Sequence, residues 1–373
     1  MKYLFLISLL LLNILIVNTS FQTTIFAKAN LDNKGKNLLL SPLSIFQVLG
    51  LTTNGAAGTT QKEMITALEA SNIGNLNNIN FQLIKAIKKF NTTEIANGVM
   101  SRAMPSKPFM KMCDKYEAPV EKLISLEQVN GWCKKKTHGK IDKILDELGP
   151  DVITILLNAV YFKGDWAFPF NPKLTRDGLF GDQNSMKKKV KMMSQTHRFN
   201  YYIDRSVQAI ELPYKNDSMS AFIILPYAGA DIDSFVNTLK INDNYLDRII
   251  KGMKKTMVKL NLPKFEVKFT SNLVSVLKKL GMKKAFTSAA EFSGIAGGHI
   301  DKVIHKTYLK VDENGSEAAA VTIVVMTNGT LPISPKVTTM NVNRPFIFIL
   351  RNKLLIKKII MKEEFLILIN LTN

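Results

Sequence analysis

Residues 312–325 constrain the fold of this chain more than any other segment. They read DENGSEAAAVTIVV, a glycine followed first by small side chains and then by β-branched ones. Gly315 can serve as a backbone hinge, the small residues can pass a narrow packing gap, and the β-branched residues favour a strand. The segment therefore suits both a flexible loop and a strand that inserts into a sheet.

The alternation of side chains indicates which face of such a strand could be buried. In an extended chain every second residue from Ser316 to Met326 points one way, and that face carries no charge. Glu317 would stay on the solvent side, and no proline lies between Glu313 and Leu331 to remove a ladder donor. Taken alone, the segment could equally be an ordinary buried strand after a turn.

Short motifs elsewhere resemble those of the serpin family, in order and spacing, from residue 36 to about residue 350. Each motif is weak singly, but together they are highly specific. They are 37–45 (NLLLSPLSI), 55–60 (GAAGTT), 157–166 (LNAVYFKGDW), 211–214 (ELPY), 262–265 (LPKF), 280–282 (LGM), 292–295 (FSGI), 305–306 (HK) and 343–346 (NRPF).

The resemblance implies an α+β serpin fold, with about eight to nine helices around three β-sheets and an exposed reactive-centre loop at about 313–336. A chain of 373 residues with 46% apolar content can bury the large single core that this fold requires. We expect one serpin domain over residues 21–373.

Residues 1–20 are predicted to be a signal peptide. They begin Met-Lys and continue with an apolar run from Leu4 to Val17 before a polar end at Ser20. A membrane anchor is the competing interpretation, but the run is short and the family domain starts almost at once. The prediction is therefore a secreted, extracellular protein without a membrane span.

An inhibitory serpin traps its target protease, serine or cysteine, in a covalent acyl complex, and the resemblance implies this function here. The cleaved loop would insert into the main sheet through a hinge. By resemblance the hinge residues are Glu313, Gly315, Ser316, Glu317, Ala318, Ala319, Ala320, Val321 and Thr322.

The family's spacing from Gly315 places the reactive bond between Gly329 and Thr330. The alternatives are Met326, Asn328 and Leu331. Since none of these is Lys or Arg, we expect an elastase-like or chymotrypsin-like target, and a cysteine protease remains open.

The resemblance also places His305 in a buried polar cluster with Ser41, Ser44 and Asn158, beneath the point where sheet strands part. Hydrogen bonds can exchange partners as strands separate, whereas interlocked apolar side chains must be pulled apart. A core histidine with no role in motion is the alternative.

Two other functional classes compete with an inhibitory serpin. A non-inhibitory serpin, acting as a carrier, storage or binding protein, is the runner-up, favoured by Gly329, by the sequon at Asn314 and by the irregular C-terminal tail. An enzyme is disfavoured because the four histidines lie in no catalytic motif. We accordingly predict no cofactor and no metal site.

Five sequons are candidate glycosylation sites, and a glycan at the hinge or at the reactive bond would hinder inhibition. They are Asn91, Asn216, Asn314, Asn328 and Asn370.

The formal net charge is +20, which favours polyanionic partners. Lys85, Lys88 and Lys89 are spaced to share a helix face where some serpins bind heparin. Heparin-like glycosaminoglycans are thus a predicted partner of the extracellular protein, which we expect to be a monomer that binds no nucleic acid. The alternative is a set of ordinary solvated lysines.

The sequence leaves two structural questions open, the state of the cysteines and the last core strand. Cys113 and Cys133 are predicted structural thiols, although an oxidising compartment would permit a disulfide. The C-terminal stretch 351–373 is atypical, and either Phe365–Leu371 or residues 359–361 must supply the last core strand.

Overall fold

The computed structural model describes residues 19–88, 93–181, 187–215, 219–241, 245–316, 336–352 and 365–371. Nine α-helices lie in these ranges, which confirms the predicted number. They are α2 (Thr19–Asp32), α3 (Pro42–Gly55), α4 (Gly58–Ala67), α5 (Ile73–Ile87), α6 (Lys107–Lys115), α7 (Leu126–Lys136), α8 (Ile232–Ile241), α9 (Tyr245–Lys251) and α10 (Val274–Lys279).

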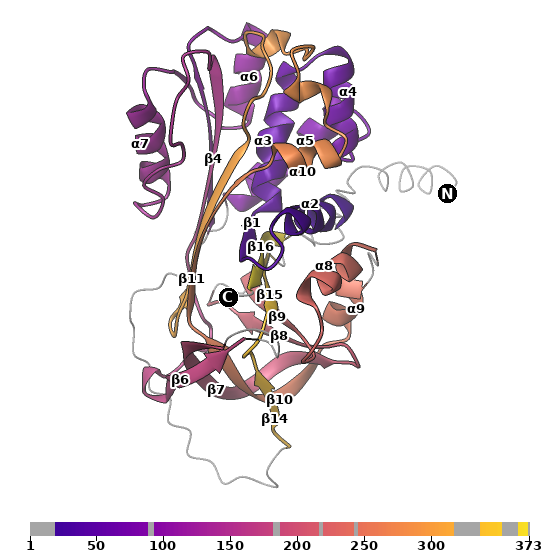
Figure 1. The fold of residues 1–373 in the computed structure, drawn as a ribbon, viewed down its shortest axis with the longest axis vertical. Helices are drawn as coiled ribbons and strands as arrows, with labels where there is room; N and C mark the ends of the chain where they lie inside the picture. The colour runs from indigo at the N-terminus through magenta and orange to yellow at the C-terminus, as the bar shows by residue number, and fades with distance from the viewer. Residues whose placement is uncertain are drawn as a thin grey trace, which may run out of the picture.

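The largest sheet occupies the lower end of the molecule in Figure 1. Its strands, in spatial order, are β1 (Leu38–Leu40), β16 (Phe365–Leu371), β15 (Phe346–Asn352), β9 (Met219–Pro226), β8 (Val207–Pro213), β7 (Lys188–Ile203), β10 (Lys254–Pro263) and β14 (Thr338–Asn341). A ninth strand, β6 (Arg176–Phe180), pairs with the first half of β7.

Long strands connect this sheet to the helical end. One group consists of β3 (Val120–Lys122), β2 (Thr93–Ser101) and β4 (Thr154–Phe162), and a second pairs β11 (Phe265–Asn272) with β12 (Ile304–Val311). A short third pair joins β5 (Gly164–Asp165) to β13 (Gly315–Ser316). Three single-turn 3₁₀ helices, η1 (Pro172–Leu174), η2 (Lys284–Phe286) and η3 (Ser293–Ile295), complete the elements.

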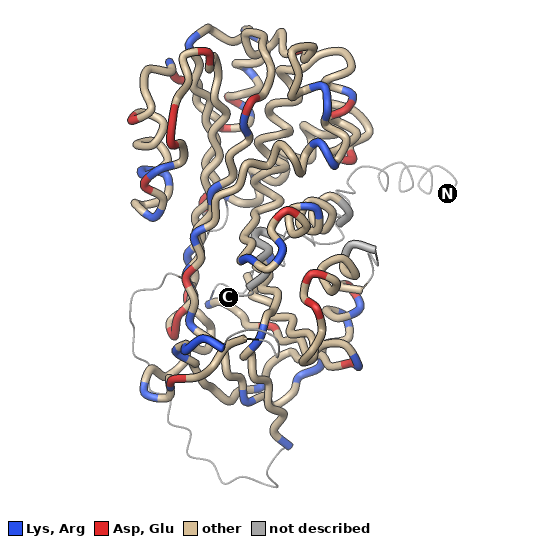
Figure 2. The backbone as a smooth tube through the Cα atoms, in the orientation of Figure 1, with Lys and Arg blue, Asp and Glu red and all other residues tan. Residues whose placement is uncertain are grey.

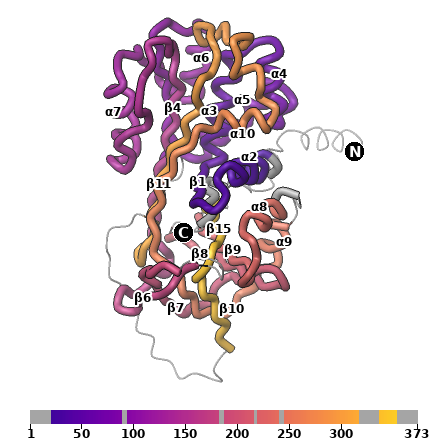
Figure 3. The backbone as a smooth tube through the Cα atoms, viewed as in Figure 1, coloured from indigo at the N-terminus to yellow at the C-terminus, as the bar shows by residue number. Residues whose placement is uncertain are grey.

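The helices lie in several places around these strands. Figure 1 shows α3, α4, α5, α6 and α10 gathered at the upper end, α8 and α9 beside the large sheet, and α7 on the other side of β4. The colour sequence in Figure 3 shows that the large sheet combines middle and C-terminal parts of the chain, and the N-terminal β1 pairs at its edge. The fold is therefore α+β, as predicted.

Helix α3 lies at the centre of the upper group and is buried along nearly its whole length. Ser41 caps its N-terminus and Pro42 occupies the first turn, where a missing N–H costs nothing. Its C-terminal end touches η3 so closely that a Cβ on Gly294 would lie 2.8 Å from the Cα atom of Gly55. Glycine at these two positions lets the backbones meet.

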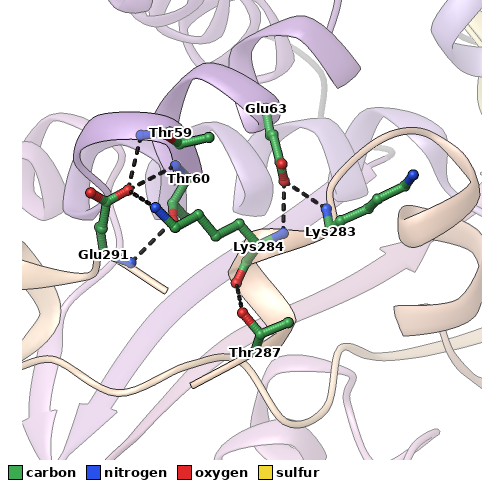
Figure 4. A network of polar contacts seen from close by, with 7 residues as sticks. All are labelled: Thr59, Thr60, Glu63, Lys283, Lys284, Thr287 and Glu291. Atoms are coloured by element: carbon green, nitrogen blue, oxygen red, sulfur yellow. Dashed lines mark hydrogen bonds and ion pairs between the residues drawn. The ribbon is translucent and has the colours of Figure 1, made fainter. Parts of the chain in front are cut away.

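A carboxylate from a distant loop caps helix α4 (Figure 4). The α4 N-cap, Ala57, has no side-chain oxygen to offer, and Glu291 instead accepts from the backbone N–H groups of Thr59 and Thr60 at 2.9 and 3.3 Å. Lys284 adds an ion pair to the same oxygen at 2.7 Å and lowers the pKa of Glu291. The contacts satisfy free donors at the helix start and join α4 to the loop after α10.

The last core strand is β16, so the structure forms it from Phe365–Leu371. It lies between β1 and β15 and pairs antiparallel with both, with Leu38 opposite Asn370 and Phe346 opposite Leu371. Removing it would expose ladder donors and acceptors on two buried strands.

We therefore expect a chain ending at Asn352 to lose its cooperative thermal transition. The loss in free energy of unfolding would be comparable with the whole ~5–15 kcal/mol that stabilises a folded domain. Circular dichroism would measure the transition. A chain ending at Leu371 is the matched control and should melt like the full-length protein. A transition in the shorter chain within a few degrees of the control would show that β16 is dispensable.

Candidate functional site

The candidate site is the seam between β4 and β12. The two strands lie next to each other, but β4 pairs with β2 whereas β12 pairs with β11. Among the described pairings, no hydrogen-bond ladder joins β4 to β12. A segment could enter here without first breaking a ladder between them.

The start of α3 is bonded to both strands of the seam. The backbone N–H of Ser41 donates to Nε2 of His305 on β12 at 3.1 Å, and the Ser44 hydroxyl donates to Oδ1 of Asn158 on β4. Asn158 in turn donates to Oδ1 of Asn97 on β2 at 2.8 Å. The structure thus brings together all four residues of the predicted polar cluster and adds Asn97, for which the sequence carried no recognised motif.

His305 is neutral in this cluster. Its ring is buried, and the loss of hydration lowers its pKa to about 3. The unprotonated Nε2 can therefore accept from Ser41 throughout the neutral range.

The hinge begins at the end of β12, where the chain turns back. The N–H of Asp312 donates to the carbonyl of Gly315 at 2.9 Å, and Gly315 and Ser316 then pair antiparallel with Asp165 and Gly164. Gly315 has φ +157°, and a Cβ there would lie 2.0 Å from the carbonyl oxygen of Gly164. Only glycine allows this approach, which gives the predicted hinge residue a physical role.

Ser316, the first residue of the predicted inserting face, is already buried within the sheet. Its hydroxyl lies 2.7 Å from the hydroxyl of Tyr214, whose ring stacks on Trp166 with centroids 4.5 Å apart. The indole N–H of Trp166 donates to the carbonyl of Asp312 at 3.0 Å. Sequence reasoning included Tyr214 and Trp166 in family motifs but assigned neither of them this contact.

Glu313 anchors the turn before the hinge. It forms a 2.7 Å ion pair with Lys264 and accepts from the hydroxyl of Thr175 at 2.8 Å. Burial alone would raise the pKa of Glu313, but the hydrogen bonds from Lys264, the backbone and Thr175 outweigh it, so that pKa is lowered. The partner of Glu313 was not predicted, because residues 264 and 313 meet only through the fold.

Several predicted residues lie outside the described ranges. These are the hinge residues 317–322, every candidate for the reactive bond, Lys89, Asn91 and Asn216. Of the other sequons, Asn314 lies in the turn, and its carbonyl accepts from the N–H of Trp166 at 2.8 Å. Asn370 lies in β16, opposite Leu38 and Ile347.

The predicted glycosaminoglycan lysines are only partly available. Lys85 lies in the last turn of α5, and Lys88 follows directly after it. The ammonium of Lys88 is 2.5 Å from a carboxylate oxygen of Glu117, which neutralises part of the expected positive face.

Both cysteines are free and buried, as predicted for structural thiols. Burial raises the pKa of Cys113 to about 12 and that of Cys133 to about 11. Within the described part of the chain, no group of three His, Cys, Asp or Glu residues could hold a metal, and no helix is long and apolar enough to cross a membrane.

A comparison with protein families matches residues 17–356 to the model described as "Serpin (serine protease inhibitor)". The chain is a serpin. Its family membership confirms the predicted fold and, together with relatives named as inhibitors, the prediction that it is not an enzyme.

Among curated proteins, this serpin is 32% identical over 345 residues to "Intracellular coagulation inhibitor 2" of Tachypleus tridentatus, covering 86% of this chain and 83% of the relative. It is also 32% identical over 360 residues to "Leukocyte elastase inhibitor" of Xenopus laevis, covering 90% and 94%. The solved structure of the thermophilic serpin Tengpin in its native state matches with a TM-score of 0.84 and 30% identity, covering 95% of this chain and 92% of Tengpin.

Burial of neutral His305 makes stability depend on pH. Between the folded pKa of about 3 and the unfolded value of 6.5, only the unfolded chain binds the proton. The histidine contribution to stability is therefore intact above pH 6.5 and falls by about 1.4 kcal/mol per pH unit as the pH drops through that window.

Urea unfolding across this range would measure the effect. In His305→Gln, whose amide oxygen can still accept from Ser41, we expect this slope to disappear, so the stability difference from wild type should change with pH. A difference that stays constant from pH 7 to pH 4 would contradict a neutral buried His305.

Proposed function

We propose that this serpin inhibits a serine or cysteine endopeptidase by inserting the segment that follows Ser316 as a strand between β4 and β12. The observation that carries the proposal is the position of Ser316, which pairs with Gly164 and is buried against Tyr214. The chain has thereby entered the first positions of an antiparallel strand alongside β5. Relatives named as inhibitors support the same function.

The covalent step follows from protease chemistry. The protease nucleophile attacks the carbonyl of the reactive bond, the peptide C–N bond breaks, and the new amine leaves with the C-terminal fragment as an acyl-enzyme ester or thioester forms. Insertion must then outpace hydrolysis by water. About fourteen residues from Ser316 to Gly329, at roughly 3.3 Å each, would carry the attached protease on the order of 45 Å. Its catalytic geometry tolerates little displacement.

The polar cluster allows the strands to part. His305 of β12 and Asn158 of β4 are each bonded to the start of α3, through Ser41 and Ser44 respectively. Separation would thus exchange hydrogen bonds in place of breaking an interlocked apolar contact. The inserted strand would gain a ladder on both sides, with roughly 1 kcal/mol net for each hydrogen bond.

The reactive bond is proposed to be Gly329–Thr330, which favours proteases with pockets for small or apolar residues. The relative named as a leukocyte elastase inhibitor agrees with an elastase-like target. The non-inhibitory alternative predicts cleavage in this region without a stable complex.

Secretion is proposed from the apolar leader. Removal of residues 1–20 would take only the first two residues of α2 and keep the buried Phe21, whose ring packs edge-on against Phe46 at 5.6 Å. Residues 21–373 would then form the single domain, as a monomer, with glycans at the predicted sequons. Heparin-like chains remain a proposed partner.

Opposite faces of the hinge should respond differently to a charge. Ala318→Arg should abolish inhibition while leaving cleavage intact, because the guanidinium would be forced beneath the inserting strand. Ala319→Arg is the matched control, since by alternation from Ser316 residue 319 would point to the solvent side of an inserted strand, and the variant should still inhibit.

A panel of elastase-like, chymotrypsin-like, trypsin-like and cysteine proteases, read by denaturing gel, would measure both outcomes. Equal inhibition by Ala318→Arg and wild type would rule out insertion as the mechanism. Clean cleavage of the wild type, with neither a stable complex nor a gain in thermal stability, would favour the non-inhibitory class.

The position of the reactive bond is tested by changing specificity. Gly329→Arg should convert the protein into an inhibitor of trypsin, because trypsin cleaves after basic residues and the wild type offers none at the proposed site. Mass spectrometry of the released peptide should then find Thr330 at its N-terminus. A new N-terminus at another residue would move the reactive bond.

A further inference from the structure

The outward face of β7 and β10 gathers three basic side chains that are far apart in the sequence. In the register of the two strands, Lys255 lies opposite Asn200, Met257 opposite Arg198, and Lys259 opposite Thr196. Arg198 therefore lies diagonally between Lys255 and Lys259, within reach of both on one face. All three side chains are exposed, and we call these residues the basic face.

The basic face has little compensating charge. Within the described part of the chain, none of its three residues forms an ion pair, and the outward positions of β7, β10 and β14 beside them hold only uncharged side chains. Glu211 on β8 comes next in the row, opposite Asn200, but it is buried and accepts hydrogen bonds from Asn200 and Ser220 at 2.5 and 2.7 Å. The exposed surface is therefore positive.

The face is also hollowed at its basic end. A pocket of about 60 Å³ is lined by Arg198, Lys255, Asn200 and the buried Glu211, with Phe168, Phe199 and Pro213 as apolar walls. Because Asn200 and Ser220 already donate to Glu211, the guanidinium of Arg198 and the ammonium of Lys255 could attract a carboxylate side chain of a partner.

The position of the face relative to the reactive loop identifies the partner. Strand β14 pairs in parallel with β10, with Thr339 opposite Lys259, and the described chain resumes at Lys336 just before it (Figure 2). If the reactive bond is Gly329–Thr330, six residues separate it from Lys336, a reach of at most about 20 Å. A protease domain, with a radius of gyration near 18 Å, would then extend over this face.

We propose that the basic face is a secondary docking surface for an acidic patch on the target protease. This assignment rests on the proposed inhibitory function. The basic face would increase the association rate by electrostatic attraction. It would also restrict the target to proteases that carry acidic residues next to their active site. The basic face thus responds to the surface charge of the protease, whereas the reactive loop determines which residue the protease cleaves after.

Two trypsins that share one specificity but differ in surface charge test the proposal. In the Gly329→Arg background, anionic and cationic trypsin would be compared by the association rate constant at low and high salt. Replacing Arg198, Lys255 and Lys259 by Gln should slow anionic trypsin about tenfold at low salt and leave cationic trypsin equally fast or faster. The difference should vanish at high salt because exposed charges are screened.

A matched control removes the same number of charges at the other end of the molecule. Helices α4 and α6 lie at the helical end in Figure 1, and Lys62 on α4 and Lys107 and Lys111 on α6 are exposed. Lys62→Gln, Lys107→Gln and Lys111→Gln together should therefore leave both rates unchanged. Thermal melting would verify that both triple variants are folded, and denaturing gels would verify that the stable complex still forms.

The outcomes separate this proposal from the function on which it rests. Equal slowing by both triple variants would show an effect of net charge and overturn the basic face. Unchanged trypsin rates with weakened retention on a heparin column would assign the surface to a sulfated glycan and also overturn it. Cleavage of the Gly329→Arg protein by both trypsins without inhibition would overturn the proposed function itself, and the docking surface with it.

Discussion

The rest of the structure depends on the start of α3, which holds two neighbouring strands that are not bonded to each other. Ser41 binds His305 on β12, and Ser44 binds Asn158 on β4. Because α3 is buried through most of its length, its N-terminus cannot move freely to follow either strand. The seam is thus kept closed by a few hydrogen bonds to one helix end. Because the site is buried and its dielectric constant is low, each of these hydrogen bonds is stronger than it would be in water.

The end of the seam nearest the large sheet shows how the hinge segment can begin to enter. The backbone at Gly315 approaches Gly164 too closely for any side chain at residue 315. The hydroxyl of Ser316 forms a hydrogen bond with the hydroxyl of Tyr214 in place of one with water. Glu313 fixes the turn through Lys264 and Thr175, so the direction of the departing chain is determined before the hinge starts. The polar cluster at α3 controls the separation of β4 and β12, and the anchored turn controls the entry of the hinge segment. Neither involves the residues that contact the protease.

Charge contributes at a different level. The formal excess of +20 remains after all carboxylates are counted, although individual lysines are locally paired, as Lys88 is with Glu117. On β7 and β10 the strand register places basic residues together on an exposed face, where attraction affects the rate of encounter more than the stability of the fold. The loop and the basic face could therefore select a protease by independent physical criteria.

The sequence by itself determined the family, the fold class, the hinge glycine and four members of the polar cluster, since short motifs in a fixed order carry that information. The β-branched and small residues after Gly315 also specify, locally, a segment that can be loop or strand. Only the tertiary structure decided the contacts between distant segments. It joined Asn97 to Asn158, Lys264 to Glu313 and Tyr214 to Ser316, and it chose Phe365–Leu371 as the last core strand. Those pairings follow from strand register and packing, which depend on the whole chain and leave no signal in either partner's local sequence.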